Sequence, residues 1–484
     1  MKMIPQCMST QHPDNVNSPF FSSSSEIGGE EEIAEAFYVF SHLGCDEQMW
    51  DCEGKEVDSY VVKKLLSRYG EFFNEKILGK DLFLTLRVPN PTVEKAEAKI
   101  LLETLESIPR SFDAAKLFYG EDIAPVFEVI LPMTGSYKCI DRIYRYYSNF
   151  VIGKQNESFK AGDITIAEWI GEFKPDEINV IPLFEDLNGM LNASEMTRKY
   201  LNDKNVDFQR IFLARSDPAM NYGLISAVLM NKLALYNCNL LSEDIGVDIH
   251  PIIGVGSAPF RGNLTPQNVD KLALEYPSAH TFTIQSSFKY DHPTNEVFDG
   301  IEKLKSIKPS KPHEVDEDRF MEIINKYSSE YEKQILSLAP TINKVAKYTP
   351  LRRKRKLHIG LFGYSRDLKG VSLPRAISFT CALYSIGLPP EILALNALNE
   401  DDLSFLSEHY LNFEKDLKDA LRYLNEDSPF LPQSVKNGLN FIDYEVHEEH
   451  QKITSDLIEI IRKDKMNNAH EMILRAAHLR KFIG

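Results

Sequence analysis

Short apolar runs alternate with longer amphipathic segments along most of this chain of 484 residues. Short runs rich in apolar and β-branched residues are typical of buried strands, whereas apolar residues at every third or fourth position are typical of helices. The intervals between the runs have this helical spacing, for example at 61–73, 93–105, 223–240 and 266–276. Eight runs are predicted to be strands, and they lie at 36–40, 82–86, 126–131, 178–184, 210–214, 249–255, 281–286 and 358–362.

This alternation predicts the fold class. Strands that alternate with helices form parallel sheets, and eight such units make a closed (β/α)8 TIM barrel. An open Rossmann sheet is disfavoured because no G-x-G-x-x-G motif follows a predicted strand. We therefore expect an α/β protein with a TIM barrel over residues 26–372.

Three segments depart from the alternation. The interval before the last predicted strand turns helical, which predicts a helical insertion at about 308–350. Residues 373–484 are almost wholly amphipathic helix, and we expect this C-terminal helical region to pack on the barrel as an additional layer. Residues 1–25 are polar and rich in Pro, Ser and Asn, and we expect them to form an N-terminal arm that reaches the barrel mouth.

Composition narrows the choice of partners and compartment. A formal net charge of −16 argues against nucleic acid, because neutralising phosphates needs a basic surface. One basic run, RRKRK at 352–356, is predicted to be an exposed segment that leads into the last strand. The six cysteines are scattered without metal-binding spacing, as in a reducing cytoplasm. With no apolar leader and no run of about 18 apolar residues, we expect a cytoplasmic protein without a membrane span.

Two predicted strands end in a carboxylate. Glu185 follows the run at 178–184, and Asp217 follows the run at 210–214. In a parallel α/β fold, active sites are built at this carboxyl end of the strands. Two hard oxygen ligands suit Mg²⁺ or Mn²⁺, with water and substrate completing the coordination shell. The alternative is that both acids are helix N-caps, since each precedes a predicted helix.

Arginines gather at the same strand ends. Arg87, Arg215 and Arg366 follow the second, fifth and eighth predicted strands. Arg261 lies in the glycine-rich loop after the sixth strand, and Gln285 lies at the end of the seventh. Guanidinium groups that converge beside a divalent cation form a pocket for a small phosphorylated or polycarboxylate anion. A single arginine is more often part of a surface salt bridge, so the prediction depends on the whole set.

His12 lies in the polar N-terminal segment. A lone histidine in such a segment is usually an exposed bystander. An arm without helical or strand pattern can nevertheless fold over a barrel mouth and place His12 in it.

Five motifs together resemble the archaeal-type phosphoenolpyruvate carboxylases. They are TQHPD at 10–14, VIPLFED at 180–186, SDPA at 216–219, GSAPFRG at 256–262 and LPRAISF at 373–379. The resemblance covers essentially the whole chain in motif order and length. Each motif alone is weak, but the set is highly specific.

The resemblance implies roles for individual residues. His12 would be the catalytic histidine, Arg261 the essential arginine of the loop, and Glu185 and Asp217 the metal ligands. The residues that would bind substrate are Arg87, Arg215, Gly256, Ser257, Gln285, Arg366 and Arg375.

The implied reaction is the formation of oxaloacetate and inorganic phosphate from phosphoenolpyruvate and bicarbonate, an anaplerotic fixation of CO₂. It would proceed through carboxyphosphate and a metal-stabilised enolate. The cofactor would be Mg²⁺ or Mn²⁺ without biotin, and the family suggests a cytoplasmic homotetramer.

The chain also departs from the larger bacterial and plant carboxylases. Their glycine-rich loop carries a histidine and a second arginine that this loop lacks, and Met220 stands where they have lysine. We expect Arg215 or Lys289 to complete the anion pocket instead. Two other functions remain open: a metal-dependent barrel lyase or aldolase acting on a pyruvate-like enolate, and a non-catalytic anion-binding scaffold.

Overall fold

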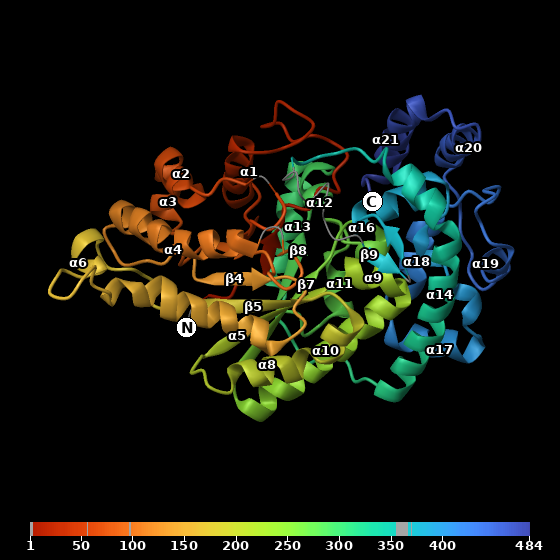
Figure 1. Cartoon of the computed structure of the whole chain (residues 1–484). Helices are drawn as coiled ribbons and strands as arrows, with labels where there is room; N and C mark the ends of the chain where they lie inside the picture. Colours follow the sequence, from red (N-terminus) through yellow and green to blue (C-terminus); the bar gives the residue numbers. More distant parts are fainter. Residues whose placement is uncertain (1–2, 56, 96–97, 355–365, 369) are drawn as a thin grey trace.

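Eight parallel strands form a closed barrel in a computed structural model of the chain, which describes residues 3–55, 57–95, 98–354, 366–368 and 370–484 (Figure 1). Each strand pairs with the next, and β8 pairs with β1 to close the ring. The predicted TIM barrel is therefore confirmed. Its strands are β1 (Cys7–Ser9), β2 (Glu47–Asp51), β3 (Phe83–Arg87), β4 (Glu128–Leu131), β5 (Asn179–Phe184), β6 (Phe208–Ala214), β7 (Asp248–Gly254) and β8 (Thr281–Ile284).

Six of the eight predicted strands are barrel strands, but the first was wrong. Residues 36–40 lie inside helix α1 (Glu30–Ser41), which has three glutamates in its first turn. A five-residue apolar run does not distinguish a strand from one face of a helix, whereas acidic residues in a first turn favour a helix. The predicted strand at 358–362 lies outside the described residues.

The sequence pattern missed β1 and β2. Strand β1 has only three residues, which is too short for a pattern. Strand β2, with the sequence EQMWD, lacks an apolar run because Glu47 points into an ionic layer inside the barrel. The N-terminal segment is therefore more than an arm, because it supplies the first barrel strand and its next residues, His12 and Pro13, line the mouth.

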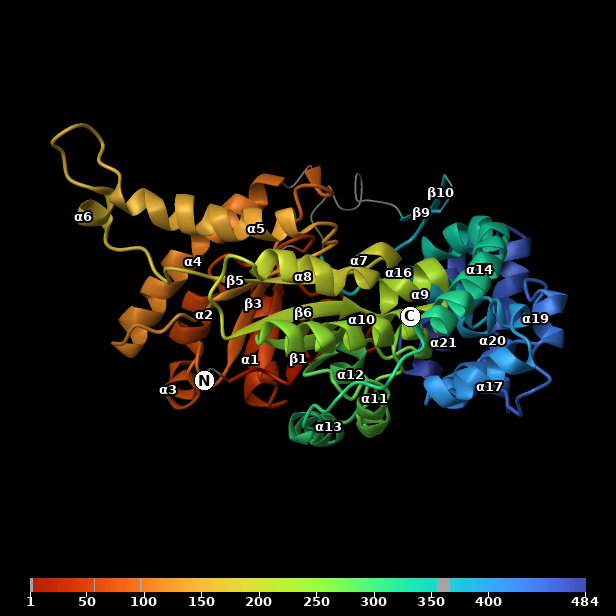
Figure 2. The same ribbon diagram turned by 90° about the horizontal axis from the view of Figure 1, so that it is seen from below.

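Helices cover the outside of the barrel (Figure 2). They include α1 and the following: α2 (Val61–Arg68), α3 (Gly70–Glu75), α4 (Ala98–Tyr119), α5 (Tyr137–Tyr146), α6 (Ile166–Ile170), α7 (Leu187–Leu191), α8 (Ala193–Leu201), α9 (Ser216–Tyr222), α10 (Leu224–Ile245), α11 (Val269–Glu275), α12 (Ser286–Tyr290) and α13 (Thr294–Ser306). Short helical turns lie at η2 (Tyr147–Ile152), η3 (Gly153–Asn156) and η4 (Pro259–Arg261).

The long helix α14 (Glu317–Ala346) matches the helical segment expected at 308–350. It is not an insertion between two barrel strands, because it follows β8, the last strand of the barrel, and helices α12 and α13. The carboxylate of Asp316 caps it by accepting a hydrogen bond from the amide of Arg319 at 3.0 Å.

A C-terminal helical layer packs on the barrel, as predicted, at the right of Figure 1. One continuous apolar core joins α10 of the barrel, α14 and the C-terminal helices. The division of the chain at residues 25 and 372 stays a prediction. The layer comprises the β9 (Arg366–Leu368) and β10 (Val371–Leu373) pair, α16 (Ala376–Ser385), η5 (Pro390–Ile392), η6 (Leu395–Ala397), α17 (Glu400–His409), α18 (Phe413–Leu421), α19 (Gln433–Asn437), α20 (Glu448–Arg462), η7 (Met466–Asn468) and α21 (Ala469–Arg480).

Helix α10 is the one helix of the described residues that is by itself long and apolar enough to cross a membrane. However, 78% of its most apolar window is buried inside the protein. Burial of this kind is expected of a core helix that lies between a barrel and a second layer.

An ionic layer lies inside the barrel, toward the amino ends of the strands. Arg210 of β6 is 1% exposed, and its guanidinium donates to Glu47 of β2 at 2.7 and 2.9 Å and to Glu128 of β4 at 2.9 Å. Thr281 of β8 accepts a longer bond from the same group, at 3.3 Å. Side chains from alternate strands thus form one layer, as TIM barrels arrange them.

Replacing Arg210 with methionine is expected to lower the free energy of unfolding by about 3–5 kcal/mol, because two carboxylates stay buried without their cation. Chemical denaturation followed by circular dichroism measures the change. The control is Arg198→Met, which breaks an exposed pair with Asp244 and should change stability by less than about 1 kcal/mol. Equal effects of the two substitutions would contradict the importance of the buried layer.

Candidate active site

Two carboxylates lie at neighbouring strand ends on the barrel mouth. Glu185 directly follows β5, and Asp217 lies in the first turn of α9, just after β6. The two strands are paired, with Leu183 opposite Phe212. Both acids line the same cavity at the carboxyl end of the barrel. The predicted pair is therefore brought together.

The alternative that both acids are helix N-caps is wrong. The cap of α7 is Asp186, whose carboxylate accepts from the amide of Gly189 at 2.7 Å, and the residue at the cap position of α9 is Arg215. Glu185 instead accepts from the amide of Met133 at 2.6 Å. This bond orients its carboxylate at the mouth.

His12 also lies at the mouth, three residues beyond β1. Its Nδ1 is 2.8 Å from the hydroxyl of Thr10, which fixes the ring. Burial, together with the positive charges of Lys55 and Arg87, holds the pKa of His12 well below its usual value, while Asp51 opposes the shift. The imidazole is therefore neutral near pH 7 and able to accept a proton.

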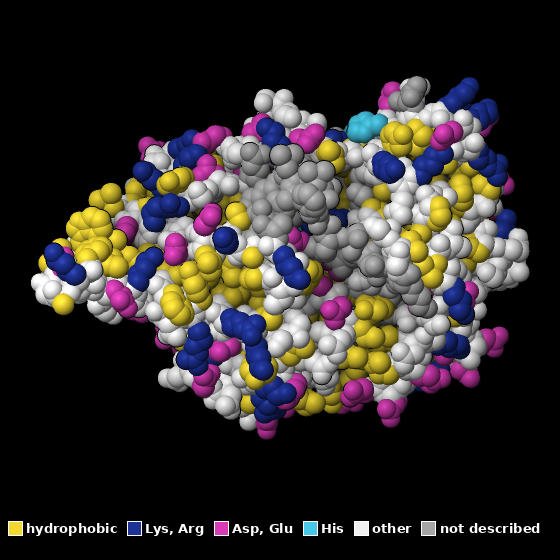
Figure 3. Space-filling model, in the orientation of Figure 1, with side chains coloured by type: hydrophobic (Ala, Val, Ile, Leu, Met, Phe, Trp, Pro, Cys, Tyr) yellow, Lys and Arg dark blue, Asp and Glu magenta, His cyan; other side chains and the backbone are white. Residues whose placement is uncertain are grey.

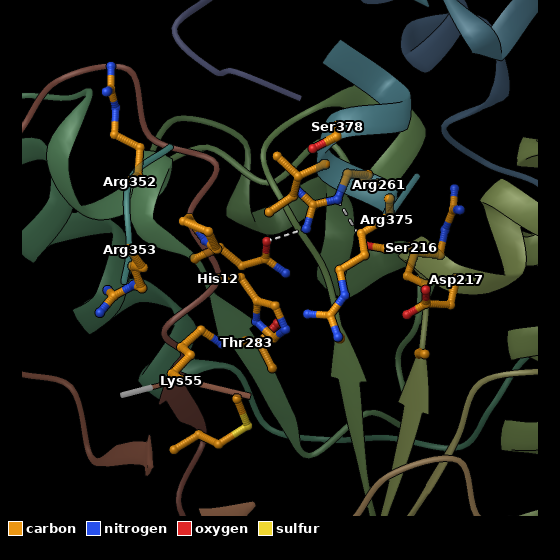
Figure 4. Close-up of a pocket in the computed structure, with 18 of the residues that line it drawn as sticks. His12, Lys55, Ser216, Asp217, Arg261, Thr283, Arg352, Arg353, Arg375 and Ser378 are labelled. Atoms are coloured by element: carbon orange, nitrogen blue, oxygen red, sulfur yellow. Dashed lines mark hydrogen bonds between the residues drawn. The ribbon is translucent and has the colours of Figure 1, made fainter. Parts of the chain in front are cut away.

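Arg261 is 1% exposed and joins four parts of the chain. Its guanidinium donates to the carboxylate of Asp14 at 3.3 Å, the carbonyl of Gly484 at 2.6 Å, the hydroxyl of Ser216 at 3.1 Å and the amide oxygen of Gln285. Figure 4 shows it above the strand ends, between His12 and Ser216. The predicted loop arginine thus has a single fixed position at the mouth.

Gly256 makes room for this arrangement. A Cβ at this position would lie 3.0 Å from the Arg261 Cζ and 3.1 Å from the Gln285 side-chain oxygen. The amide of the next residue, Ser257, donates to Asp14 at 3.5 Å, so an anion of the chain itself occupies this part of the loop. Substrate binding by Gly256 and Ser257 stays a prediction.

Arg87 lies among acids that the sequence analysis did not single out. It donates to Asp51 at 2.9 and 3.1 Å and pairs with Glu53 at 2.6 Å. Lys55 forms an ion pair with the same Asp51 and also lines the mouth. Asp51 ends β2 and Lys55 follows it by four residues, a spacing that matches no characteristic motif. Because β2 is polar, the sequence pattern did not predict this strand or the two residues at its end.

The other predicted arginines lie in different surroundings. Arg215 is 1% exposed and donates to the carbonyl of Phe260 at 3.3 Å, which ties β6 to the loop of Arg261. Arg375 lies at the N-cap of α16 and lines the mouth. Arg366 begins β9, and its side chain lies outside the described part of the structure. Their roles in substrate binding stay predictions.

The basic run at 352–356 is not the exposed segment that was expected. Arg352 is 6% exposed and donates to the carbonyl of Val16 at 2.8 Å. Arg353 is 2% exposed and pairs with Glu32 and Glu35 of α1, each at 2.5 Å. Both arginines line the mouth, whereas residues 355 and 356 lie outside the described residues.

Lys289 does not complete the anion pocket. Its ammonium group is buried against Glu35 at 2.8 Å and donates to the Ser9 hydroxyl and the Thr10 carbonyl, each at 3.0 Å. It therefore holds the segment that carries His12 and does not line the mouth cavity.

The donor set at Glu185 and Asp217 fits Mg²⁺ or Mn²⁺. Mg²⁺ is usually held by one or two carboxylates, with waters and substrate oxygens completing its shell. Here two carboxylates face one cavity that also contains Arg261 and Arg375, side chains that bind oxyanions. Among the described residues, no cluster of three or more His, Cys, Asp or Glu side chains forms an all-protein metal site. A metal shared with an anionic substrate agrees with both observations.

The fold and this site define a TIM-barrel enzyme with a carboxylate pair, a neutral histidine and arginines at the barrel mouth. The sequence model of the family described as phosphoenolpyruvate carboxylase matches residues 4–484. The phosphoenolpyruvate carboxylase of Methanothermobacter thermautotrophicus is 60% identical over 99% of this chain and 100% of its own length. That of Pyrococcus furiosus is 54% identical over the full length of both. The chain belongs to the phosphoenolpyruvate carboxylase family, whose members are carboxy-lyases.

One buried acid attaches the loop of Arg261 to the helical layer. Glu391 of η5 is fully buried and accepts from the amide of Phe260 at 2.5 Å and from the hydroxyl of Tyr384 at 2.6 Å. Burial raises the pKa of Glu391 to about 7. The folded protein therefore keeps this proton at pH values at which the unfolded chain releases it.

This linkage predicts a pH dependence of stability. The contribution of Glu391 is present at acidic pH and is lost as pH rises from about 4.5 through 7, at about 1 kcal/mol per pH unit. Glu391→Gln is permanently neutral, so its stability relative to the wild type should rise over this range. Unfolding free energies of both proteins at pH 5, 6, 7 and 8 test this. A difference that does not change with pH would contradict it.

Proposed function

We propose that this protein catalyses the formation of oxaloacetate and inorganic phosphate from phosphoenolpyruvate and bicarbonate. The observation that carries the proposal is the meeting of neutral His12, Arg261 and the Glu185–Asp217 pair in one cavity. Each supplies something that the reaction needs: a base, a phosphate-directed cation and ligands for a divalent metal.

The first step transfers a phosphoryl group. A bicarbonate oxygen attacks phosphorus, the bond to the enol oxygen breaks, and carboxyphosphate and the enolate of pyruvate form. Arg261, fixed by four partners, and Arg375 at the N-cap of α16 bind the phosphoryl oxygens as charge moves across them. Glu185 and Asp217 would hold Mg²⁺ or Mn²⁺, which would supply positive charge to offset the negative charge that develops in the reaction.

The second step needs a base. His12 takes the carboxyl proton of carboxyphosphate, the carbon–oxygen bond to phosphate breaks, and CO₂ is released. The enolate carbon then attacks CO₂, and the proton passes from His12 to the phosphate. The low pKa of His12 leaves the ring neutral for the first of these transfers.

The remaining properties that we propose follow the family resemblance. They are a homotetramer in the cytoplasm, activity with Mg²⁺ or Mn²⁺ without biotin, and no nucleic-acid or membrane partner. Figure 3 shows acidic and basic side chains interspersed over the described part of one face, which supports the absence of a nucleic-acid partner.

A metal-dependent lyase or aldolase acting on a pyruvate-like enolate is the second candidate, because the carboxylate pair at the mouth suits such an enzyme. It does not require His12 beside the metal site or phosphate-directed arginines. Phosphate release that depends on bicarbonate separates the two functions, and an inert anion-binding scaffold would release none.

Purified protein should form oxaloacetate from phosphoenolpyruvate only when both bicarbonate and a divalent metal are present. Coupling to malate dehydrogenase and NADH oxidation measures the product, and EDTA should abolish it reversibly. Asp217→Asn should raise the Mg²⁺ concentration needed by at least about tenfold, since it removes a charged ligand. Product formation without bicarbonate would exclude a carboxylase, and an unchanged Mg²⁺ requirement would remove Asp217 from the metal site.

His12→Asn keeps a polar side chain of similar size but removes the base. Oxaloacetate formation should fall by at least about a hundredfold, because general base catalysis contributes that much. Binding of phosphoenolpyruvate with Mg²⁺, measured by calorimetry, should change little. Turnover close to that of the wild type would exclude His12 from the mechanism.

A further inference from the structure

One question of the proposed reaction concerns the cation that holds bicarbonate. The loop lacks the second arginine of the larger carboxylases, and Met220 replaces their lysine. Lys289 is buried against Glu35, and Arg215 donates to the Phe260 carbonyl. Arg215 lines the mouth beside Asp217, after β6, so the opposite side of the mouth needs a cation from another segment.

Strand order shows where the carboxyl end of carboxyphosphate lies. In a ring of eight strands, β5 lies opposite β1, and β6 lies opposite β2. The carboxylates Glu185 and Asp217 follow β5 and β6, whereas His12 follows β1 and Lys55 follows β2. Figure 4 shows Lys55 and His12 on one side of the mouth and Asp217 on the other. If the metal and Arg261 hold the phosphoryl group, the carboxyl group that His12 deprotonates lies beside Lys55.

Lys55 is built into this side of the site. It is 5% exposed, lines the mouth cavity and forms an ion pair with Asp51, four residues earlier in the chain. Asp51 is held in turn by Arg87 of β3, through bonds of 2.9 and 3.1 Å. The ammonium group therefore has a fixed position and a low-dielectric surrounding, in which a hydrogen bond to an anion is strengthened.

We propose that Lys55 binds bicarbonate and then the carboxyl group of carboxyphosphate, held in place by Asp51. The inference rests on the proposed function of the site. Lys55 donates hydrogen bonds to carboxyl oxygens and gives up no proton. His12 takes the proton when the carbon–oxygen bond breaks, and CO₂ stays beside the enolate that it joins.

Three arginines at the mouth, Arg352, Arg353 and Arg87, are bound to backbone carbonyls or to carboxylates of the protein. Arg352 donates to backbone carbonyls of residues 15 and 16, and Arg353 pairs with Glu32 and Glu35. Arg87 bridges Asp51 and Glu53. Lys55 carries a more compact charged group than these arginines, which suits a small anion such as bicarbonate.

Lys55 also acts on His12 through its charge. The charged groups that face His12 are Lys55, Arg87 and Arg261, which lower its pKa, and Asp51, which raises it. Removing the charge of Lys55 therefore raises the pKa of His12. Since His12 must be unprotonated to accept a proton, the acidic limb of the pH–rate profile should then move to higher pH.

The test uses Lys55→Met, with Lys55→Gln as a second neutral variant and Lys55→Arg as a variant that keeps the charge. Both neutral variants should raise KM for bicarbonate by about tenfold to a hundredfold, the loss expected for a hydrogen bond to a charged group. KM for phosphoenolpyruvate should change less than threefold, and the acidic limb of kcat/KM for bicarbonate should shift upward. Lys55→Arg should recover most of the bicarbonate affinity.

A matched control is Lys232→Met. Lys232 is 4% exposed and pairs with Glu275 at 2.6 Å away from the mouth, so its loss should lower stability without changing KM for bicarbonate. An unchanged bicarbonate KM in folded Lys55→Met or Lys55→Gln would overturn the inference, as would a rise confined to KM for phosphoenolpyruvate. A wild-type protein that forms no oxaloacetate would instead overturn the proposed function, so the two failures are distinguishable.

Discussion

The site depends on one buried guanidinium group. Arg261 contacts Asp14 near the start of the chain, Gly484 at its other end, Ser216 after β6 and Gln285 after β8. A guanidinium offers five donors in a rigid fork, so a single side chain can fix several loops at once. A lysine in the same place would satisfy fewer of these acceptors and fix none of their directions. The C-terminal helical region therefore also positions the site, since Gly484 accepts a hydrogen bond from Arg261.

The barrel separates two groups of charges with an apolar layer. Near the amino ends of the strands, Arg210 forms ion pairs with both Glu47 and Glu128. Above them, side chains such as Met49, Leu183 and Phe212 fill the barrel and form the floor of the mouth. This floor keeps water from reaching the site from below, which strengthens every electrostatic interaction at the mouth.

The sequence pattern predicted the barrel, most of its strands and the site at their carboxyl ends, because apolar strands and acids at strand ends are local signals. It failed where tertiary pairing decides the structure. The run at 36–40 is helical, and Glu32 and Glu35 of that helix are buried only because Arg353 and Lys289 meet them from distant segments. The same ion pairs bury Arg353, although the basic run at 352–356 was predicted to be exposed. Such partners are far apart in the chain, and no local pattern indicates them.

The mouth must satisfy two opposed requirements. Anionic substrates need cations, but cations lower the pKa of a nearby histidine and so weaken it as a base. Asp51 reconciles the two, because it pairs with both Lys55 and Arg87 while its own charge raises the pKa of His12. The pairing also keeps Asp51 ionised: although burial opposes it, Arg87 and Lys55 hold its pKa well below the usual value. A carboxylate that need not contact substrate thus sets how strongly His12 can accept a proton.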